Sequence, residues 1–176
     1  AGKTVEVCGF PPPSSGAIAV GQILGILAQT PAAAMKLDGA GLPTADWLYY
    51  YTEAARLAFA DRAQYVADPD FVQPPAGSWM SLLDPAYLKS RAALIGAQSL
   101  KVAQPGQPGA LKIGFAPMPE QPEYGTSHIS IVDAHGNALA MTTTIEDAFG
   151  ARQMVKGFLL NNELTDFSFA YADAAG

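Results

Sequence analysis

The chain has 176 residues, of which 49% are hydrophobic and 15% are charged, and its formal net charge is −6. A chain of this length and apolar content can bury a core, which excludes intrinsic disorder. The acidic balance, without any cluster of Lys and Arg, excludes a nucleic-acid partner. The small share of charged residues indicates that part of the surface packs against other protein segments.

Cysteine and histidine are too few for a disulfide framework or a metal centre. The only cysteine is Cys8 and the only histidines are His128 and His135, so no metal-ligand spacing occurs and no cofactor is predicted. The longest apolar stretch, Ala17 to Ala28, is interrupted by polar and glycine residues and is too short for a bilayer of about 30 Å. We therefore expect no membrane span in this chain, and the residues do not predict a compartment.

The first part of the chain predicts one strand and two helices. A short strand over residues 5–10 ends at a run of three prolines, which lack N–H donors. A helix with Ser14 or Ser15 as its N-cap runs to Pro31, because apolar residues recur at helical spacing. A second helix is predicted from about Thr44 to Val66 by the same periodicity.

A third helix and a long connection follow. Asp84 is a suitable N-cap, Pro85 suits the first helical position, and Gly96 is a stop signal. Residues 97–124 have no period of either kind and contain five prolines. This pattern is typical of a long, mobile connection.

The last third of the chain is rich in strand-forming residues. Two runs, 126–133 and 138–145, flank the turn sequence 134–137, which predicts an antiparallel hairpin. A third apolar run, 157–160, precedes a polar loop over residues 161–166. Helices followed by antiparallel strands predict an α+β fold.

The number of residues in the hairpin loop determines whether Thr126 and Thr144 lie opposite each other. A two-residue loop would send the two side chains to opposite faces. A three-residue loop, with Gly136 left-handed and Asp133 paired with Asn137, places Thr126 directly across from Thr144. Asp in the first turn position and Gly at the positive-φ position favour this longer loop. The threonines of the second strand are also ordinary strand formers, and that plainer interpretation stays open.

Residues 125–150 resemble the processing and small-subunit motif of the gamma-glutamyltransferase (gamma-glutamyltranspeptidase) family of N-terminal nucleophile hydrolases. Three other stretches resemble further segments of the family, in family order: residues 11–16, residues 53–62 with 68–71, and residues 159–167. The resemblance implies part of an αββα layered sandwich.

The resemblance also implies that a precursor breaks its own Gly125–Thr126 bond. Residues 1–125 would form the C-terminal part of the large-subunit region, and residues 126–176 the N-terminal part of the small-subunit region, within one structural domain. The freed Thr126 would attack glutathione and related γ-glutamyl amides and pass the γ-glutamyl group to water or an amino acid. Thr144 corresponds to the second threonine of the family, which bonds the nucleophile.

By the same resemblance, Glu163 and Asp166 correspond to an acidic pair that holds the substrate α-ammonium group through charge-assisted hydrogen bonds. Glu146 stands where many family members have an Asn that binds the amino-acid part of the substrate. Segments for the substrate carboxylate and the oxyanion hole would lie outside residues 1–176, so the remaining subunit segments are expected partners. Without oxyanion donors, the rate would fall on the order of 10² to 10³. The family resemblance is compatible with a periplasmic or extracellular location.

Two alternatives stay open. A glutaryl (cephalosporin) acylase of the same family uses this chemistry on amides that lack the α-ammonium group, although Glu163 and Asp166 favour γ-glutamyl substrates. The chain could instead be an unprocessed fragment that serves only as a structural or binding module. His128, two residues after Thr126, is a candidate base, but a strand histidine more often packs.

Overall fold

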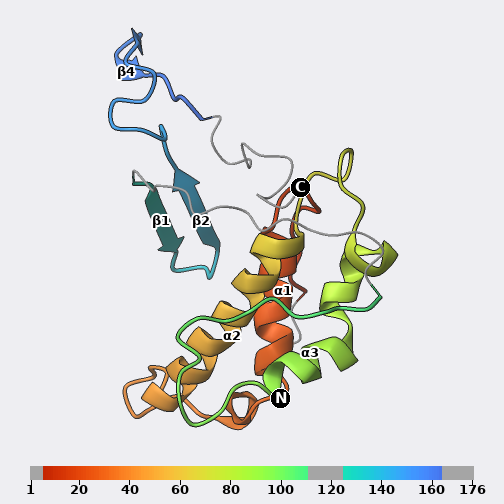
Figure 1. Ribbon diagram of the computed structural model, residues 1–176. Helices are drawn as coiled ribbons and strands as arrows, with labels where there is room; N and C mark the ends of the chain where they lie inside the picture. Colours follow the sequence, from red (N-terminus) through yellow and green to blue (C-terminus); the bar gives the residue numbers. More distant parts are fainter. Residues whose placement is uncertain (1–5, 111–124, 164–176) are drawn as a thin grey trace. The chain divides into compact units, whose positions relative to one another are not determined.

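The structure is a computed structural model that describes residues 6–110 and 125–163. The chain divides into two compact units, Ala1–Pro117 and Met118–Gly176 (Figure 1). In the described residues the first unit is helical and the second contains antiparallel strands, so the fold is α+β as predicted. The αββα layering and the single-domain organisation stay predictions.

The helices of the first unit form where the sequence pattern predicts them. The elements are α1 (Gly16–Leu27), η1 (Pro31–Ala34), α2 (Ala45–Tyr65), η2 (Pro75–Gly77), η3 (Trp79–Leu83) and α3 (Pro85–Ala92). No helix in residues 6–110 or 125–163 has the length and apolarity needed to span a bilayer.

Of the predicted N-caps, Asp84 binds the first turn of its helix and Ser15 does not, and Thr44, the predicted start of the second helix, also acts as a cap. Thr44 and Asp84 accept hydrogen bonds from first-turn amides of α2 and α3, which satisfies donors that have no partner inside the helix. Ser15 occupies the N-cap position of α1 without a capping bond. Its hydroxyl instead accepts a hydrogen bond from Arg62 Nε of α2 at 2.7 Å, so Ser15 joins two helices.

The predicted N-terminal strand and the predicted end of the third helix are both wrong. Residues 6–10 have no regular structure, because no strand among the described residues offers them a hydrogen-bonded neighbour. Residue 5 lies outside the described residues. Helix α3 ends at Ala92 and not near Gly96, since its last carbonyls accept short-range bonds that tighten the final turn.

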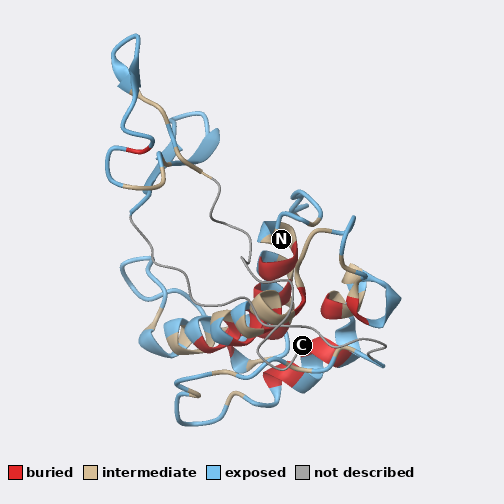
Figure 2. Ribbon diagram, turned by 45° about the horizontal axis from the view of Figure 1, so that its top comes forward, coloured by how far each residue is buried: buried red, intermediate tan, exposed pale blue. Residues whose placement is uncertain are grey.

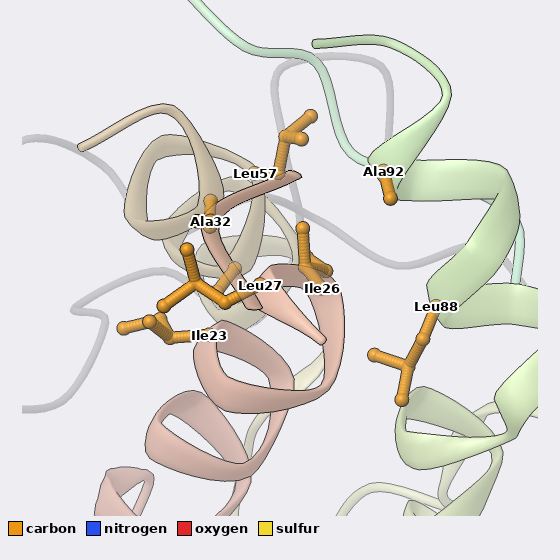
Figure 3. Close-up of a cluster of buried hydrophobic side chains, with 9 residues drawn as sticks. Ile23, Ile26, Leu27, Ala32, Leu57, Leu88 and Ala92 are labelled. Carbon is orange, nitrogen blue, oxygen red and sulfur yellow. The ribbon is translucent and has the colours of Figure 1, made fainter. Parts of the chain in front are cut away.

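The apolar core of the first unit lies where α1, α2 and α3 face one another. Figure 2 shows the buried residues gathered on the inner sides of these helices. Ile26 of α1 and Leu57 of α2 are 0% and 1% exposed, and Leu88 of α3 belongs to the same cluster (Figure 3). Burial of each such side chain stabilises the fold by about 1.5–3 kcal/mol.

Two buried acids of α2 hold residues 99–106, a segment without helix or strand. The Glu53 carboxylate accepts a hydroxyl and an amide hydrogen bond at the start of the segment, at 2.7 and 2.8 Å. Asp61 accepts the amide of Gly106 at its end, at 2.8 Å, and pairs with Arg91 at 3.0 Å. This part of the predicted mobile connection is therefore fixed by specific contacts, and its later part lies outside the described residues.

The second unit contains two antiparallel pairs of strands. They are β1 (Ser127–Val132) with β2 (Ala138–Thr143), and β3 (Met154–Val155) with β4 (Phe158–Leu159). The first pair confirms the predicted hairpin. The second pair contains the third apolar run and leads into the polar loop.

Candidate active site

The hairpin of β1 and β2 has the register that the three-residue loop predicts. Ser127 pairs with Thr143, and the same alignment continues to the turn, where the Asp133 amide donates to the Asn137 carbonyl at 3.0 Å. Gly136 has φ of +84°, the left-handed conformation expected of it. The prediction of this register is confirmed.

Asp133 holds the turn together. Its carboxylate accepts hydrogen bonds from the backbone amides of His135 and Asn137 at 2.8 and 2.9 Å, and from the Asn137 side chain at 2.8 Å. The hydrogen bond from the Asn137 side chain, followed by that from its backbone, lowers the pKa of Asp133 below its ordinary value. The charged carboxylate thus stabilises the turn that sets the register.

Thr126 and Thr144 lie at the open end of the hairpin. Thr126 directly precedes β1 and Thr144 directly follows β2, so one more step of the register sets them opposite each other. The Thr144 hydroxyl donates to the Gly125 carbonyl at 3.4 Å and accepts a hydrogen bond from the Glu146 amide at 2.9 Å. These threonines line an open hollow of about 480 Å³, together with Gly125, Ser127, Thr143 and Ile145.

The segment after Thr144 is tied to the polar loop that follows β4. The Asp147 amide donates to Asn162 Oδ1 at 3.1 Å, and the Asn162 amide donates to the Ile145 carbonyl at 3.4 Å. Glu163 follows Asn162 directly, and both Glu163 and Glu146 are half-buried. The structure therefore brings these two predicted substrate residues to the end of the hairpin where the threonines lie.

Gly150 and Asn162 are site-forming residues that the sequence reasoning missed. A Cβ atom on Gly150 would lie 2.2 Å from the Leu160 carbonyl oxygen, so only glycine fits between the two segments. The Ala151 amide donates to the same oxygen at 2.9 Å. Glycine inside a strand pattern can signal close backbone approach, but Gly150 lies in a turn beyond the strand run, so no local sequence signal marked this contact.

The two remaining candidate residues are Asp166 and His128. Asp166 lies outside the described residues. His128 faces Thr142 across the hairpin, with its Nδ1 atom 2.8 Å from the Thr142 hydroxyl. In residues 6–110 and 125–163, no three His, Cys, Asp or Glu side chains are grouped so as to hold a metal ion.

Comparison with known proteins gives one family. The sequence model of that family, described as gamma-glutamyltranspeptidase, matches residues 2–175. The chain is 42% identical over 160 residues to a glutathione hydrolase proenzyme of Pseudomonas aeruginosa, covering 90% of this chain and 26% of that protein. It is 41% identical over 165 residues to the glutathione hydrolase proenzyme of Escherichia coli K12, covering 93% of this chain and 26% of that protein.

A less similar relative is named as an acylase. An acylase ACY 1 proenzyme of a Pseudomonas species is 34% identical over 164 residues, which cover 92% of this chain and 26% of the acylase. The chain thus spans about a quarter of the length of each of these relatives. The match over nearly all of its residues places the chain in the gamma-glutamyltranspeptidase family.

Proposed function

We propose that the chain carries the nucleophile of a γ-glutamyl transfer and hydrolysis reaction, and that Thr126 acts once the Gly125–Thr126 bond is broken. The observation that carries the proposal is the Thr144 hydroxyl, which lies 3.4 Å from the Gly125 carbonyl oxygen in a hollow that Thr126 also lines. Membership of the family supports it, as do relatives named glutathione hydrolase proenzyme.

Chain cleavage begins with attack of the Thr126 hydroxyl oxygen on the Gly125 carbonyl carbon. The C–O bond forms, the C–N bond breaks, and the hydroxyl proton ends on the Thr126 nitrogen, which gives an ester and an amine. Water then hydrolyses the ester to the Gly125 carboxylate and regenerates the hydroxyl. Gly125 has φ of +109°, a conformation open to glycine, and it presents no Cβ to the attacking oxygen.

Substrate turnover uses the α-amine that cleavage frees on Thr126. A free α-amine has a reference pKa of about 7.7–8.0, so a neutral fraction exists near pH 7 to accept the Thr126 hydroxyl proton. The oxygen attacks the γ-carbonyl of the donor, the amine leaves with a proton, and a γ-glutamyl ester remains on Thr126. Water or an amino acid then takes the γ-glutamyl group. Thr144 bonds the nucleophile and keeps it oriented.

The acids beyond the hairpin hold the donor. Glu163 and Asp166 bind the α-ammonium group, and Glu146 adds a third carboxylate. Two hydrogen bonds support this placement of Glu163 and Glu146. The Asn162 amide donates to the Ile145 carbonyl, and the Asp147 amide donates to the Asn162 side chain.

The remaining subunit segments complete the αββα sandwich in this proposal. One face of the hairpin is apolar, and its large side chains are 41–54% exposed: Ile129, Ile131, Leu139 and Met141. An exposed apolar face of this kind supports packing against further protein segments.

The test uses the full-length protein that contains this chain. Intact mass after incubation should show two pieces that meet at Gly125 and Thr126, and Thr126→Ala should stay whole. Ser130→Ala, farther along the same strand, is the matched control and should cleave normally. Cleavage at this bond despite Thr126→Ala would mean that another protease makes the cut, and one stable mass from wild-type protein would favour a silent structural module.

A glutaryl acylase is the second candidate, because one relative is named an acylase. Rates with γ-glutamyl and glutaryl p-nitroanilide distinguish the two, since the glutaryl group lacks the ammonium. A preference for the glutaryl compound would overturn the γ-glutamyl proposal.

A further inference from the structure

His128 and Thr142 form a polar pair that the proposed reaction does not use. They are directly opposed in the hairpin, with His128 Nδ1 2.8 Å from the Thr142 hydroxyl. Both residues are exposed, so the remaining ring nitrogen is open to contact with a small molecule.

This pair lies on the face of the hairpin that carries Thr126 and Thr144. Side chains two residues apart on a strand point to the same face, and such residues lie about 7 Å apart along it. The intervening side chains, such as Ile129, belong to the opposite, apolar face. The polar face thus carries two successive rows, first the two threonines and then His128 with Thr142.

The two rows have a fixed order relative to the acids. Glu146 and Glu163 lie beyond the open end of the hairpin, because the Glu146 amide bonds Thr144 and Asn162 bonds Ile145. His128 lies on the other side of Thr126, toward the turn. A γ-glutamyl amide with its ammonium at the acids and its carbonyl at Thr126 therefore directs its leaving amine toward His128.

We propose that His128 is a specificity-determining residue that binds a carboxylate of the leaving amine, or of the amino acid that accepts the γ-glutamyl group. Thr142 donates its hydroxyl proton to Nδ1, which fixes the ring and leaves the Nε2–H group to donate to the carboxylate. Glutathione fits, because its leaving dipeptide ends in a carboxylate. The inference rests on the proposed function.

The experiment compares two donors on full-length protein. Glutathione has a leaving group with a carboxylate, whereas γ-glutamyl-p-nitroanilide does not. For His128→Ala and for Thr142→Val, the ratio of kcat/KM for glutathione to kcat/KM for the anilide should fall about 10- to 100-fold, as expected for loss of a hydrogen bond to a charged group. Thr142→Ser keeps the hydroxyl and should restore the wild-type ratio, and Ser130→Ala, one row farther, should leave it unchanged.

The outcomes separate this subsite from the reaction itself. An equal fall for both donors, or an unchanged ratio in Thr142→Val, would overturn the subsite while the γ-glutamyl reaction stands. If His128→Ala does not fold, the Thr142 variants decide the result, because they leave the imidazole in place. Wild-type protein that turns over neither donor would refute the proposed function and, with it, the subsite.

Discussion

Replacing Asp61 with Asn removes the negative charge at the centre of the first unit. The Asp61 carboxylate is 0% exposed and lies 3.0 Å from the guanidinium of Arg91, which is 4% exposed. It also accepts hydrogen bonds at 2.8 Å from Gln22, from the Tyr87 hydroxyl and from the Gly106 amide. Burial, and next the Asp61 charge, raise the pKa of Tyr87, so its hydroxyl remains a protonated donor.

The expected loss is large because the four groups named above that contact the Asp61 carboxylate are all donors. An Asn side chain would turn its own N–H groups toward some of these donors, and it would leave the Arg91 charge buried without compensation. Breaking a buried ion pair by removing one partner costs about 3–5 kcal/mol. Residues 99–106 and the facing turns of α2 should therefore open roughly 100 to 4,000 times more often. Hydrogen exchange read by mass spectrometry on full-length protein measures this opening peptide by peptide.

Asp70→Asn is the matched control, since Asp70 is exposed and its loss should change stability by less than about 0.5 kcal/mol. The double variant Asp61→Asn, Arg91→Met should recover part of the protection, because no uncompensated charge remains. If Asp61→Asn speeds exchange of residues 99–106 no more than Asp70→Asn does, the carboxylate does not hold the segment and the reasoning is refuted.

Three further predictions concern single contacts. Because its hydrogen bonds lower the pKa of Asp133 below the ordinary 3.8, its stabilisation of the hairpin is full above that value and is lost as pH falls through the lowered pKa. Hairpin amide exchange followed down to about pH 2 should show this loss in wild type and not in Asp133→Ala. Gly106→Ala should destabilise the first unit by about 1–3 kcal/mol in chemical denaturation, since its Cβ would lie 2.4 Å from a tyrosine hydroxyl. Gly96→Ala, with nothing within 4 Å, should change little. Gly150→Ala should raise KM for γ-glutamyl-p-nitroanilide, because its Cβ would lie 2.2 Å from the Leu160 carbonyl oxygen and separate the segments that position the acids.

The helices were predictable because their signals are local. Thr44 and Asp84 bind amides within the next three residues, so both starts can be read from a few adjacent letters. The same local evidence misled at Ser15, whose hydroxyl bonds Arg62, 47 residues away. A capping residue can serve a distant partner instead, and a sequence window does not contain that partner.

The alignment of Thr126 with Thr144 was predictable for a related reason. The turn chemistry of Asp133 and Gly136 is local, yet a hairpin transmits it along both strands, because a slip of one residue would turn every side chain to the other face. A short sequence motif at one end thus determines which side chains are opposed at the other end.

The buried acids of α2 could not be predicted from periodicity. Acidic side chains are seldom fully buried unless they are paired, so a sequence pattern favours an exposed position for Glu53 and Asp61. Their partners in the segment 99–106 lie 45 to 47 residues away and have no pattern of their own. Only the tertiary contacts reveal that this segment is held.

The backbone conformation around the proposed pocket could not be predicted from local residue preferences either. Glu146 offers a test of this conformation. Its φ is +71°, a left-handed conformation that costs a Glu about 1 kcal/mol or more and that persists only where neighbours impose it. Asn adopts this conformation more readily, so Glu146→Asn should stabilise the second unit by about 0.5–1 kcal/mol, measured by hydrogen exchange. The same change removes a carboxylate from the proposed ammonium site and should raise KM for γ-glutamyl-p-nitroanilide about fivefold. A gain in stability with unchanged KM would show that the negative charge of Glu146 does not contribute to ammonium binding, and a loss of stability would show that its backbone is not strained.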